Sequence, residues 1–148
     1  MKEQIIRKSR ATEIEVLIMI WLNGNTRAHS FIHPDYWLSH IDYMRHALQQ
    51  ADVYVCEVNG EIAGFAGIDG NYIAGLFVDE NYQSQGIGTS LIDFIKQHHF
   101  TITLAVYKKN EKALQFYSKL GFAVTEERID TRTGEKELLM RWNRACPI

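Results

Sequence analysis

A strand, a glycine loop and an amphipathic helix follow one another between residues 72 and 97, and this succession constrains the fold most. Tyr72–Val78 is apolar and β-prone, and a polar turn over Asp79–Gln83 separates it from the glycines Gly86 and Gly88. Apolar residues then recur at helical spacing, at Ile87, Leu91, Phe94 and Ile95. The N-terminus of the predicted helix therefore faces the glycine loop.

The loop Gln83–Ser90 has the features of an anion-binding site. Glycines let a ligand approach the backbone, and the first N–H groups of a helix lack an intrahelical acceptor. The helix dipole favours negative charge at the same place. We therefore interpret the loop as a diphosphate-binding site. For an isolated Gly-x-Gly pair, the alternative is a tight connection that binds nothing.

Length and composition predict one α/β globular domain over residues 1–148. The chain has 46% hydrophobic and 23% charged residues, a formal charge of −2 and a pI near 6.3, so no net basic field favours nucleic acid or an anionic membrane. No apolar run approaches the roughly 20 residues of a membrane span, and no signal-peptide core follows Met1–Gln4. These features predict a cytoplasmic protein.

Cysteine and histidine spacing gives no indication of a metal site. Cys56 and Cys146 lie far apart, and we interpret both as reduced thiols. His29 and His33 stand four residues apart, but Pro34 disfavours a helix at His33 and no third ligand accompanies them. No bound metal is expected.

Two helices are predicted near the N-terminus. The first begins at the capping box Thr12-x-x-Glu15 and ends at the stop signal Asn23-Gly24-Asn25. The second begins at Pro34 and carries an apolar stripe at Trp37, Ile41, Met44 and Leu48. The loop 25–33 between them is either a solvated connection or a substrate loop, with the candidate residues His29, Phe31 and His33.

Alternating and apolar runs predict seven strands, at residues 5–6, 52–58, 61–68, 72–78, 101–107, 122–127 and 137–142. Asp52–Val58 is apolar on both faces and should be central. Turns at Asn59-Gly60 and Asp69-Gly70 predict an antiparallel meander. A helical crossover should make the strand Thr101–Tyr107 parallel to Tyr72–Val78.

A last helix is predicted between the N-cap Asn110 and Gly121, before a closing hairpin whose loop spans 128–136. The expected order is β-α-α-β-β-β-α-β-α-β-β, a mixed sheet of the α/β class. A doubly wound dinucleotide-binding fold is excluded because a third glycine and a repeated βαβ unit are missing. A P-loop NTPase is excluded because no Gly-Lys-Ser/Thr follows the glycines.

This order and two motifs resemble the GNAT superfamily of acyl-CoA-dependent N-acyltransferases over nearly the whole chain. Gln83–Gly88 fits Q/R-x-x-G-x-G/A, and Asn110–Phe122 fits N-x-x-A-x-x-F-Y-x-x-x-G-F. Within the superfamily, the segment Ile20–Trp37 is most similar to the small bacterial YiaC/YjaB-type acetyltransferases. The resemblance implies a GNAT-like fold in which the fourth and fifth strands are parallel and splayed.

The resemblance implies acetyl transfer from acetyl-CoA to a primary amine, of a protein lysine or a small molecule, by direct attack in a ternary complex. A monomer or homodimer is expected, and recognition of the acceptor should lie in the loop after the first helix and in the closing hairpin. The implied acetyl-CoA-binding residues are Phe77, Val78, Gln83, Gln85, Gly86, Ile87, Gly88, Thr89, Ser90 and Asn110.

Two tyrosines are the catalytic candidates. The leaving thiol, with a pKa of about 8.5, departs more readily when a phenol donates a proton, and the motif assigns this role to Tyr117. Without the motif, Tyr117 is equally a core tyrosine. Many relatives have a glutamate in the fourth strand, whereas this chain offers Tyr72, with His29 and His33 as weaker candidates for the base. A non-enzymatic acyl-CoA sensor is the alternative function.

Overall fold

Seven strands form one mixed sheet in the computed structural model, which describes residues 3–145. The sheet order is β1-β2-β3-β4-β5-β7-β6. The strands are β1 (Gln4–Lys8), β2 (Asp52–Val58), β3 (Glu61–Asp69), β4 (Tyr72–Val78), β5 (Thr101–Tyr107), β6 (Ala123–Ile129) and β7 (Lys136–Asn143). The helices are η1 (Ala11–Glu13), α1 (Ile14–Ala28), α2 (Pro34–Leu38), α3 (Ile41–Gln50), η2 (Glu80–Tyr82), α4 (Ile87–Gln97) and α5 (Glu111–Lys119). The predicted order and fold class are confirmed.

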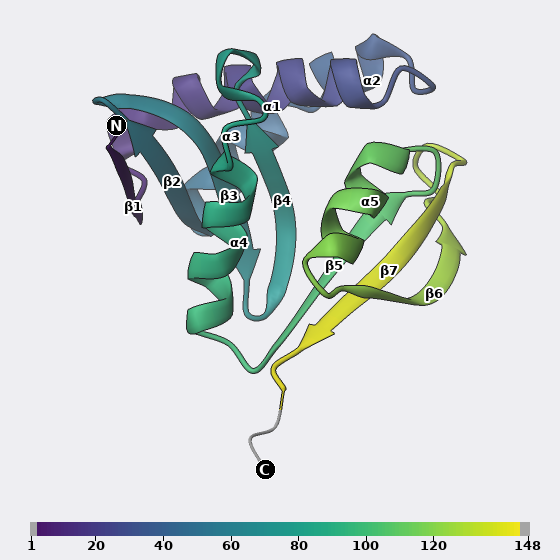
Figure 1. Ribbon diagram of the computed structural model, residues 1–148. Helices are drawn as coiled ribbons and strands as arrows, with labels where there is room; N and C mark the ends of the chain where they lie inside the picture. The colour runs from purple at the N-terminus through teal and green to yellow at the C-terminus, as the bar shows by residue number, and fades with distance from the viewer. Residues whose placement is uncertain (1–2, 146–148) are drawn as a thin grey trace.

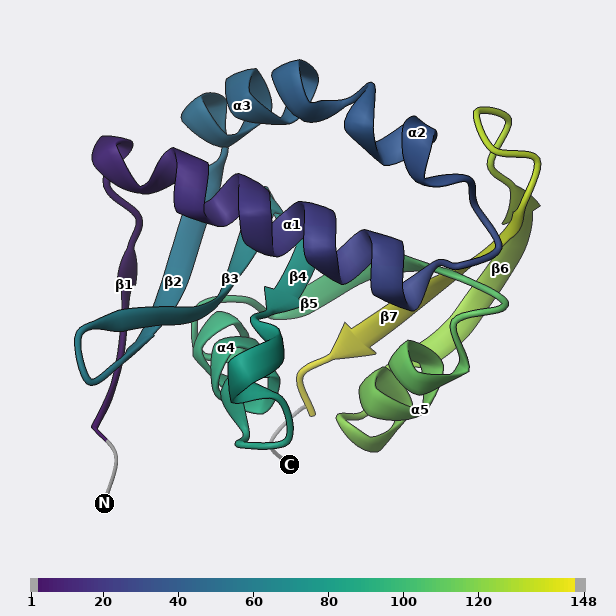
Figure 2. The ribbon, with the colours of Figure 1, turned by 90° about the horizontal axis from the view of Figure 1, so that it is seen from above.

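Helices cover both faces of the sheet. Figures 1 and 2 show α1, α2 and α3 on one face and α4 and α5 on the other. Val53 and Val55 of β2 pack with the first group, whereas Cys56 packs under α4. β2 is therefore buried on both faces, as its apolar run predicted. Cys56 is a buried free thiol, and Cys146 lies outside the described residues.

The sheet opens between β4 and β5. These parallel strands pair only at Tyr72↔Thr103 and Ile73↔Leu104, although β4 stays paired with β3 as far as Val78 and β5 with β7 as far as Tyr107. Figure 1 shows the two strands diverging from this shared end. The predicted splayed pair is confirmed, and it leaves part of the inner edge of β4 without a neighbouring strand.

The predicted end of the first helix is wrong, because α1 continues through Asn23-Gly24-Asn25 to Ala28. The buried Asn25 donates its side-chain N–H to the Trp21 carbonyl oxygen, 3.0 Å away. This bond to the preceding turn of α1 gives the buried amide group a hydrogen-bond partner inside the helix. At Gly24, a β-carbon would lie 3.1 Å from Cδ1 of Phe77. The glycine permits close packing of α1 against β4, and this tertiary contact outweighs its low helix propensity. Residues 25–28 of the predicted loop 25–33 are therefore helical, and the connection between α1 and α2 is shorter than predicted.

The predicted capping box lies two residues too far along the chain. The helix is preceded by the turn η1, in which the backbone N–H of Arg10 donates to the Glu13 carboxylate at 2.7 Å. The pattern at Thr12 and Glu15 resembles a capping box, but Glu15 pairs with Arg45 of α3 instead. The structure thus has an acidic residue three positions after an N-cap, but the pair is Arg10 and Glu13 rather than Thr12 and Glu15.

The predicted second helix is divided into α2 and α3. At the break, the Ser39 hydroxyl donates to the Tyr36 carbonyl oxygen at 2.8 Å, and Nδ1 of His40 lies 2.6 Å from the same oxygen. Side chains therefore satisfy the end of α2 and allow the chain to turn. The stripe itself faces the core as predicted, since Trp37 and Leu48 are buried and Ile41 and Met44 pack beside them.

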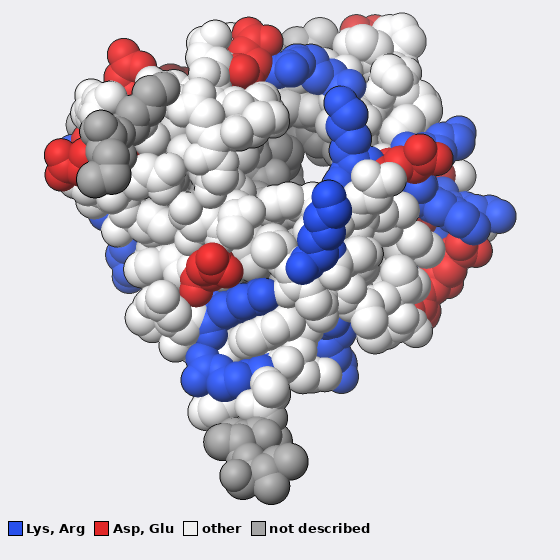
Figure 3. All heavy atoms as spheres, in the orientation of Figure 1, with Lys and Arg blue, Asp and Glu red and all other residues white. Residues whose placement is uncertain are grey.

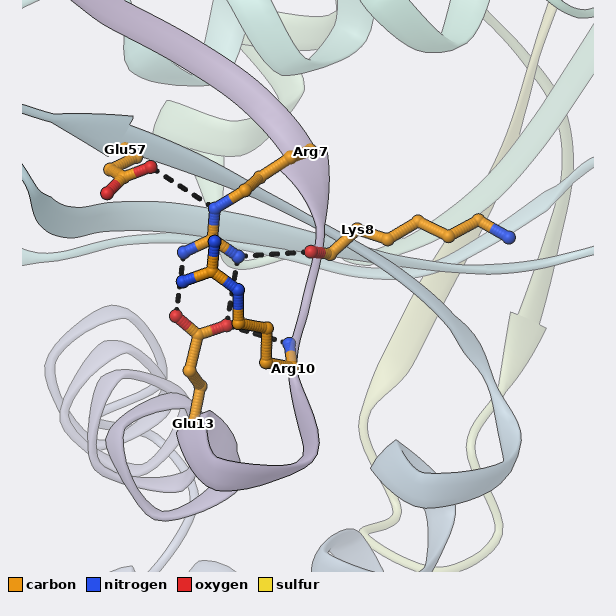
Figure 4. A network of polar contacts seen from close by, with 5 residues as sticks. All are labelled: Arg7, Lys8, Arg10, Glu13 and Glu57. Atoms are coloured by element: carbon orange, nitrogen blue, oxygen red, sulfur yellow. Dashed lines mark hydrogen bonds and ion pairs between the residues drawn. The ribbon is translucent and has the colours of Figure 1, made fainter.

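An ion-pair network ties the N-terminal strand to the start of α1. Arg7 of β1 donates to the Glu13 carboxylate at 2.7 and 3.0 Å and to Glu57 of β2 at 3.2 Å (Figure 4). The side chains of these three residues are at most 20% exposed. The bonds from Arg7 hold the pKa of the Glu13 carboxyl below its ordinary value.

Replacing Glu13 by glutamine is expected to lower the free energy of unfolding by about 1–3 kcal/mol at pH 7, because a charge-assisted bond to Arg7 is lost. A carboxyl with a lowered folded-state pKa stabilises the fold above its unfolded pKa, so the difference from wild type should begin to shrink as the pH falls below about 4.3 and disappear only below the lowered folded-state pKa. Urea denaturation at several pH values measures it. Glu15→Gln, which breaks an exposed ion pair, should change stability by less than about 1 kcal/mol.

Candidate active site

A cavity of about 920 Å³ lies between the N-terminal ends of α4 and α5 and reaches the end of α1. Its position follows from the splayed strands, since Leu76, Phe77 and Val78 of β4 line it. The predicted acetyl-CoA-binding residues that line the cavity are Phe77, Val78, Gln83, Gly86, Ile87, Gly88, Thr89 and Asn110. The structure thus brings together eight residues from three separate segments.

Two predicted residues, Gln85 and Ser90, do not line this cavity. The Gln85 side chain donates to the Asn81 carbonyl oxygen at 3.4 Å, within the loop itself. The Ser90 hydroxyl donates to the side chain of Gln4 at 2.9 Å, on β1. The Gln85 side chain therefore bonds within the loop, whereas the Ser90 hydroxyl ties α4 to β1.

The glycines of the loop have different roles. Gly86 is the N-cap of α4 and adopts φ +79°, a left-handed conformation that favours glycine. The first turn of α4 holds no acidic side chain, so its positive dipole end is not neutralised from within. At Gly88 a β-carbon would lie 3.0 Å from Cζ of Phe116. Gly88 therefore makes room for α5, in addition to lining the cavity.

The Val78 carbonyl is already engaged by the protein. The side-chain N–H of Gln83 donates to this oxygen at 2.8 Å. Gln83 therefore braces the end of β4 against the start of the loop. A ligand that donates to the Val78 carbonyl oxygen must either displace Gln83 or use the second lone pair of that oxygen.

Three cations border the large cavity, and sequence reasoning missed them. Arg27 comes from the end of α1, and Lys109 and Lys112 flank the start of α5. Figure 3 shows a hollow on this face with Lys and Arg side chains along it. Arg27 also pairs with Glu80 at 3.2 Å. These residues are dispersed in the sequence, so only the fold brings the three cations together at the border of one cavity.

A second cavity, of about 250 Å³, lies on the other side of the strand opening. Its distinctive lining is aromatic and charged: Trp21, Trp37, Tyr72, Tyr107, Asp130, Arg132 and Glu137. The two cavities share the residues His29, Leu76, Phe77, Asn110, Ala113 and Tyr117. A molecule in one cavity can therefore reach a molecule in the other through the gap between β4 and β5.

Tyr117 lies at this junction. The residue is 8% exposed and lines both cavities, and its ring packs against Phe116 and Phe122. Within residues 3–145, no group forms a hydrogen bond with its hydroxyl. Burial raises the pKa of the Tyr117 phenol above its ordinary value. The hydroxyl is therefore protonated at neutral pH and available to a bound molecule.

Tyr72 borders only the smaller cavity. Burial, and then the negative charge of Glu137, raise the pKa of its phenol. A phenol that holds its proton so firmly is a poor base at neutral pH, but it can orient an amine by hydrogen bonding.

Asp130 is a buried carboxylate at the smaller cavity, 6% exposed. The Tyr107 hydroxyl donates to Oδ2 at 2.7 Å, and the Arg132 backbone N–H donates to Oδ1 at 3.0 Å. Burial alone would raise the pKa of Asp130, but these bonds and the Arg132 charge hold it below its ordinary value. Asp130 is therefore ionised at neutral pH. Asp130 is not predicted as a site residue from the sequence, because the segment 128–136 resembles a solvated hairpin loop.

The three candidates of the substrate loop separate in space. His29 borders both cavities, whereas Phe31 and His33 border neither. Phe31 packs edge-on against His29, with ring centroids 5.6 Å apart. His33 is exposed and caps α2 by accepting a bond from the Asp35 N–H at 3.1 Å. Of these three candidates, only His29 is placed to affect a bound molecule.

Residues 3–145 contain neither a cluster of metal-ligand side chains nor a membrane-spanning helix. No group of three or more His, Cys, Asp or Glu side chains is arranged to hold a metal ion. Within the same residues, no helix has the length and apolar character that crossing a bilayer requires.

Comparisons with known proteins agree with this geometry. A family model described as an acetyltransferase (GNAT) domain matches residues 21–143. The peptidyl-lysine N-acetyltransferase YiaC of Escherichia coli is 32% identical over 146 residues, 97% of each chain. The peptidyl-lysine N-acetyltransferase YjaB of the same organism is 31% identical over 81% of this chain and 82% of its own.

Solved structures show the same architecture. The solution structure of apo-form YjaB from Escherichia coli matches with a TM-score of 0.86 and 28% identity, over 97% of this chain and 99% of that one. The PaiA N-acetyltransferase of Thermoplasma acidophilum, solved in complex with coenzyme A, matches with a TM-score of 0.77 and 20% identity, over 96% and 99%. At that identity, the second match shows the fold alone.

Proposed function

Because the chain belongs to the GNAT acetyltransferase family and is an acetyl-CoA-dependent N-acetyltransferase, we propose that its acceptor is a lysine side chain of a protein or peptide. The observation that carries this proposal is the smaller cavity, which joins the buried Asp130 carboxylate to Tyr117. The names of two relatives support the same acceptor. The alternative of a non-catalytic sensor is set aside because the family and the named relatives are enzymes.

In this proposal the large cavity holds acetyl-CoA. The free N–H groups at the start of α4 bind the diphosphate, and Arg27, Lys109 and Lys112 attract the phosphates. The pantetheine arm lies along Phe77 and Val78, where β4 has lost its β5 neighbour, and bonds to the main chain as an added strand would. These contacts would carry the thioester toward Tyr117.

The smaller cavity then receives the acceptor. A lysine chain fits between the aromatic side chains of Trp37, Tyr72 and Tyr107, and the Asp130 charge attracts its ammonium group. Asp130 is too weak a base to deprotonate an amine whose pKa is about 10.4. We therefore assign it to binding, and the amine loses its proton to water.

Transfer proceeds by direct attack. The neutral amine nitrogen bonds to the thioester carbonyl carbon, and the carbon–sulfur bond breaks. The nitrogen releases its remaining extra proton to water, and the sulfur takes a proton from the Tyr117 hydroxyl, which water then restores. Tyr117 is suited to this step because its hydroxyl has no other partner among the described residues.

Release of free CoA thiol with matched peptides tests the acceptor. Three peptides are needed: one with blocked termini and a single lysine, one in which arginine replaces that lysine, and one with a free α-amine and no lysine. Thiol release and one acetyl group on the lysine are expected only with the first. Release only with the third peptide would assign an α-amine acceptor and contradict the lysine proposal.

A further inference from the structure

A chain of side-chain hydrogen bonds crosses the opening between the two halves of the sheet. Oδ1 of Asn110 accepts from the Ala113 backbone N–H at 3.2 Å, and Nδ2 of Asn110 lies 3.1 Å from Nε2 of His29. Nδ1 of His29 lies 3.0 Å from Oδ1 of Asn25, and Nδ2 of Asn25 donates to the Trp21 carbonyl oxygen at 3.0 Å. The chain links the start of α5 to the body of α1.

Backbone groups at both ends determine the direction of every bond. Ala113 offers only a donor, so Asn110 must present its oxygen there and its N–H to His29. Trp21 offers only an acceptor, so Asn25 must present its N–H there and its oxygen to His29. His29 must therefore accept at Nε2 and donate at Nδ1. Only the neutral Nδ1–H tautomer satisfies both contacts.

The surroundings of His29 keep it in this form. Its ring lies among Phe31, Trp37 and Tyr107, with centroids 5.0 to 5.6 Å away. Burial lowers the pKa of His29 to about 4, and among residues 3–145 Tyr107 is the titratable ring that packs against it. His29 is thus neutral at physiological pH, and neither nitrogen is free to act as a base.

The location gives the bond chain a function. β4 and β5 are unpaired beyond Ile73 and Leu104, so no backbone ladder holds the two halves together at the cavity end. His29 and Asn110 line both cavities at that end. We propose that His29 is a positioning residue, which fixes the Asn110 amide for the acetyl donor and holds the strand opening at a set width. This inference rests on the proposed contact between Asn110 and acetyl-CoA.

Two substitutions divide the contacts of His29. Glutamine carries its amide about as far from the backbone as Nε2, so His29→Gln retains the bond to Asn110. Asparagine carries its amide about as far as Nδ1, so His29→Asn retains the bond to Asn25 and loses Asn110. Calorimetry should show a Kd for CoA about 5- to 20-fold higher in His29→Asn, the loss of one oriented hydrogen bond, and within about 3-fold of wild type in His29→Gln.

Two further measurements address a merely structural role. In the Asn110→Ala background, His29→Asn should weaken CoA binding no further, since the two residues act through one bond. In the wild-type protein, ¹⁵N NMR should show His29 as the neutral Nδ1–H tautomer. Thermal melting of both variants checks that they fold, and the NMR result requires no variant.

Several results would overturn the inference. The inference is wrong if His29→Asn and His29→Gln weaken CoA binding equally. It is also wrong if the NMR spectrum shows a proton on Nε2 of His29. If Asn110→Ala weakens CoA binding and His29→Asn does not, positioning by His29 is wrong and the role of Asn110 stands. If Asn110→Ala has no effect, the proposed Asn110 contact fails and this inference fails with it.

Discussion

Replacing Tyr117 by phenylalanine is expected to lower kcat for acetyl transfer by about 100-fold or more, which is the usual contribution of a general acid. The KM for acetyl-CoA should stay within about 3-fold, because only a hydroxyl at the junction of the cavities is removed. Stability should change little, since that hydroxyl has no hydrogen-bond partner within residues 3–145. Steady-state kinetics and thermal melting measure the three quantities.

Tyr43→Phe is the matched control for this prediction. Tyr43 lies on α3, is 66% exposed and borders neither cavity, so its loss of a hydroxyl should leave kcat unchanged. Near wild-type kcat in Tyr117→Phe would refute the role of Tyr117 as the acid. A rise in KM with unchanged kcat would instead assign the hydroxyl to binding.

Replacing Asp130 by asparagine should raise the KM for a lysine peptide by about 10- to 30-fold. At an effective dielectric constant near 20, a unit charge about 4 Å from an ammonium contributes at most about 4 kcal/mol, and Arg132 offsets part of it. The KM for acetyl-CoA should not change, because Asp130 borders only the smaller cavity. Kinetics with each substrate varied in turn separate the two effects.

Two controls distinguish charge from shape in this experiment. Glu127→Gln removes a carboxylate that pairs with Lys108 on the surface and borders neither cavity, so acceptor KM should stay at the wild-type value. An acceptor amine that is uncharged at pH 7 should react equally well with wild type and Asp130→Asn. Loss of activity toward both charged and uncharged acceptors would indicate a distorted hairpin and contradict the electrostatic role.

The structure explains why the helical predictions failed where they did. The stop at Asn23-Gly24-Asn25 depends on local propensity, but Gly24 meets Phe77 of β4, more than fifty residues away in the sequence. The break between α2 and α3 depends on side chains that cap Tyr36, although the apolar stripe across them is continuous. Local signals located the elements, and long-range contacts set their ends.

The site shows the same division. Gly86, Asn110 and Tyr117 could be found in advance, because each belongs to a short motif within one strand–helix unit. Arg27 and Asp130 could not, because each becomes part of a cavity only through elements distant in sequence. His29 is predicted as a substrate-loop residue and as a weaker candidate for the base, and it does border both cavities. The hydrogen bonds at both of its ring nitrogens disfavour the role of base.

By itself the sequence determined the order of strands and helices, the glycine loop before the N-terminus of α4, and the motifs that carry the family resemblance. The elements follow from periodicity and turn signals, and the motifs are short runs of neighbouring residues, so all of these are local properties of the chain. Only the tertiary structure decided how wide β4 and β5 open, which charges border each cavity, and which tautomer His29 adopts. Those properties depend on distances between groups that folding alone brings together, and burial then sets their charge and hydrogen bonding.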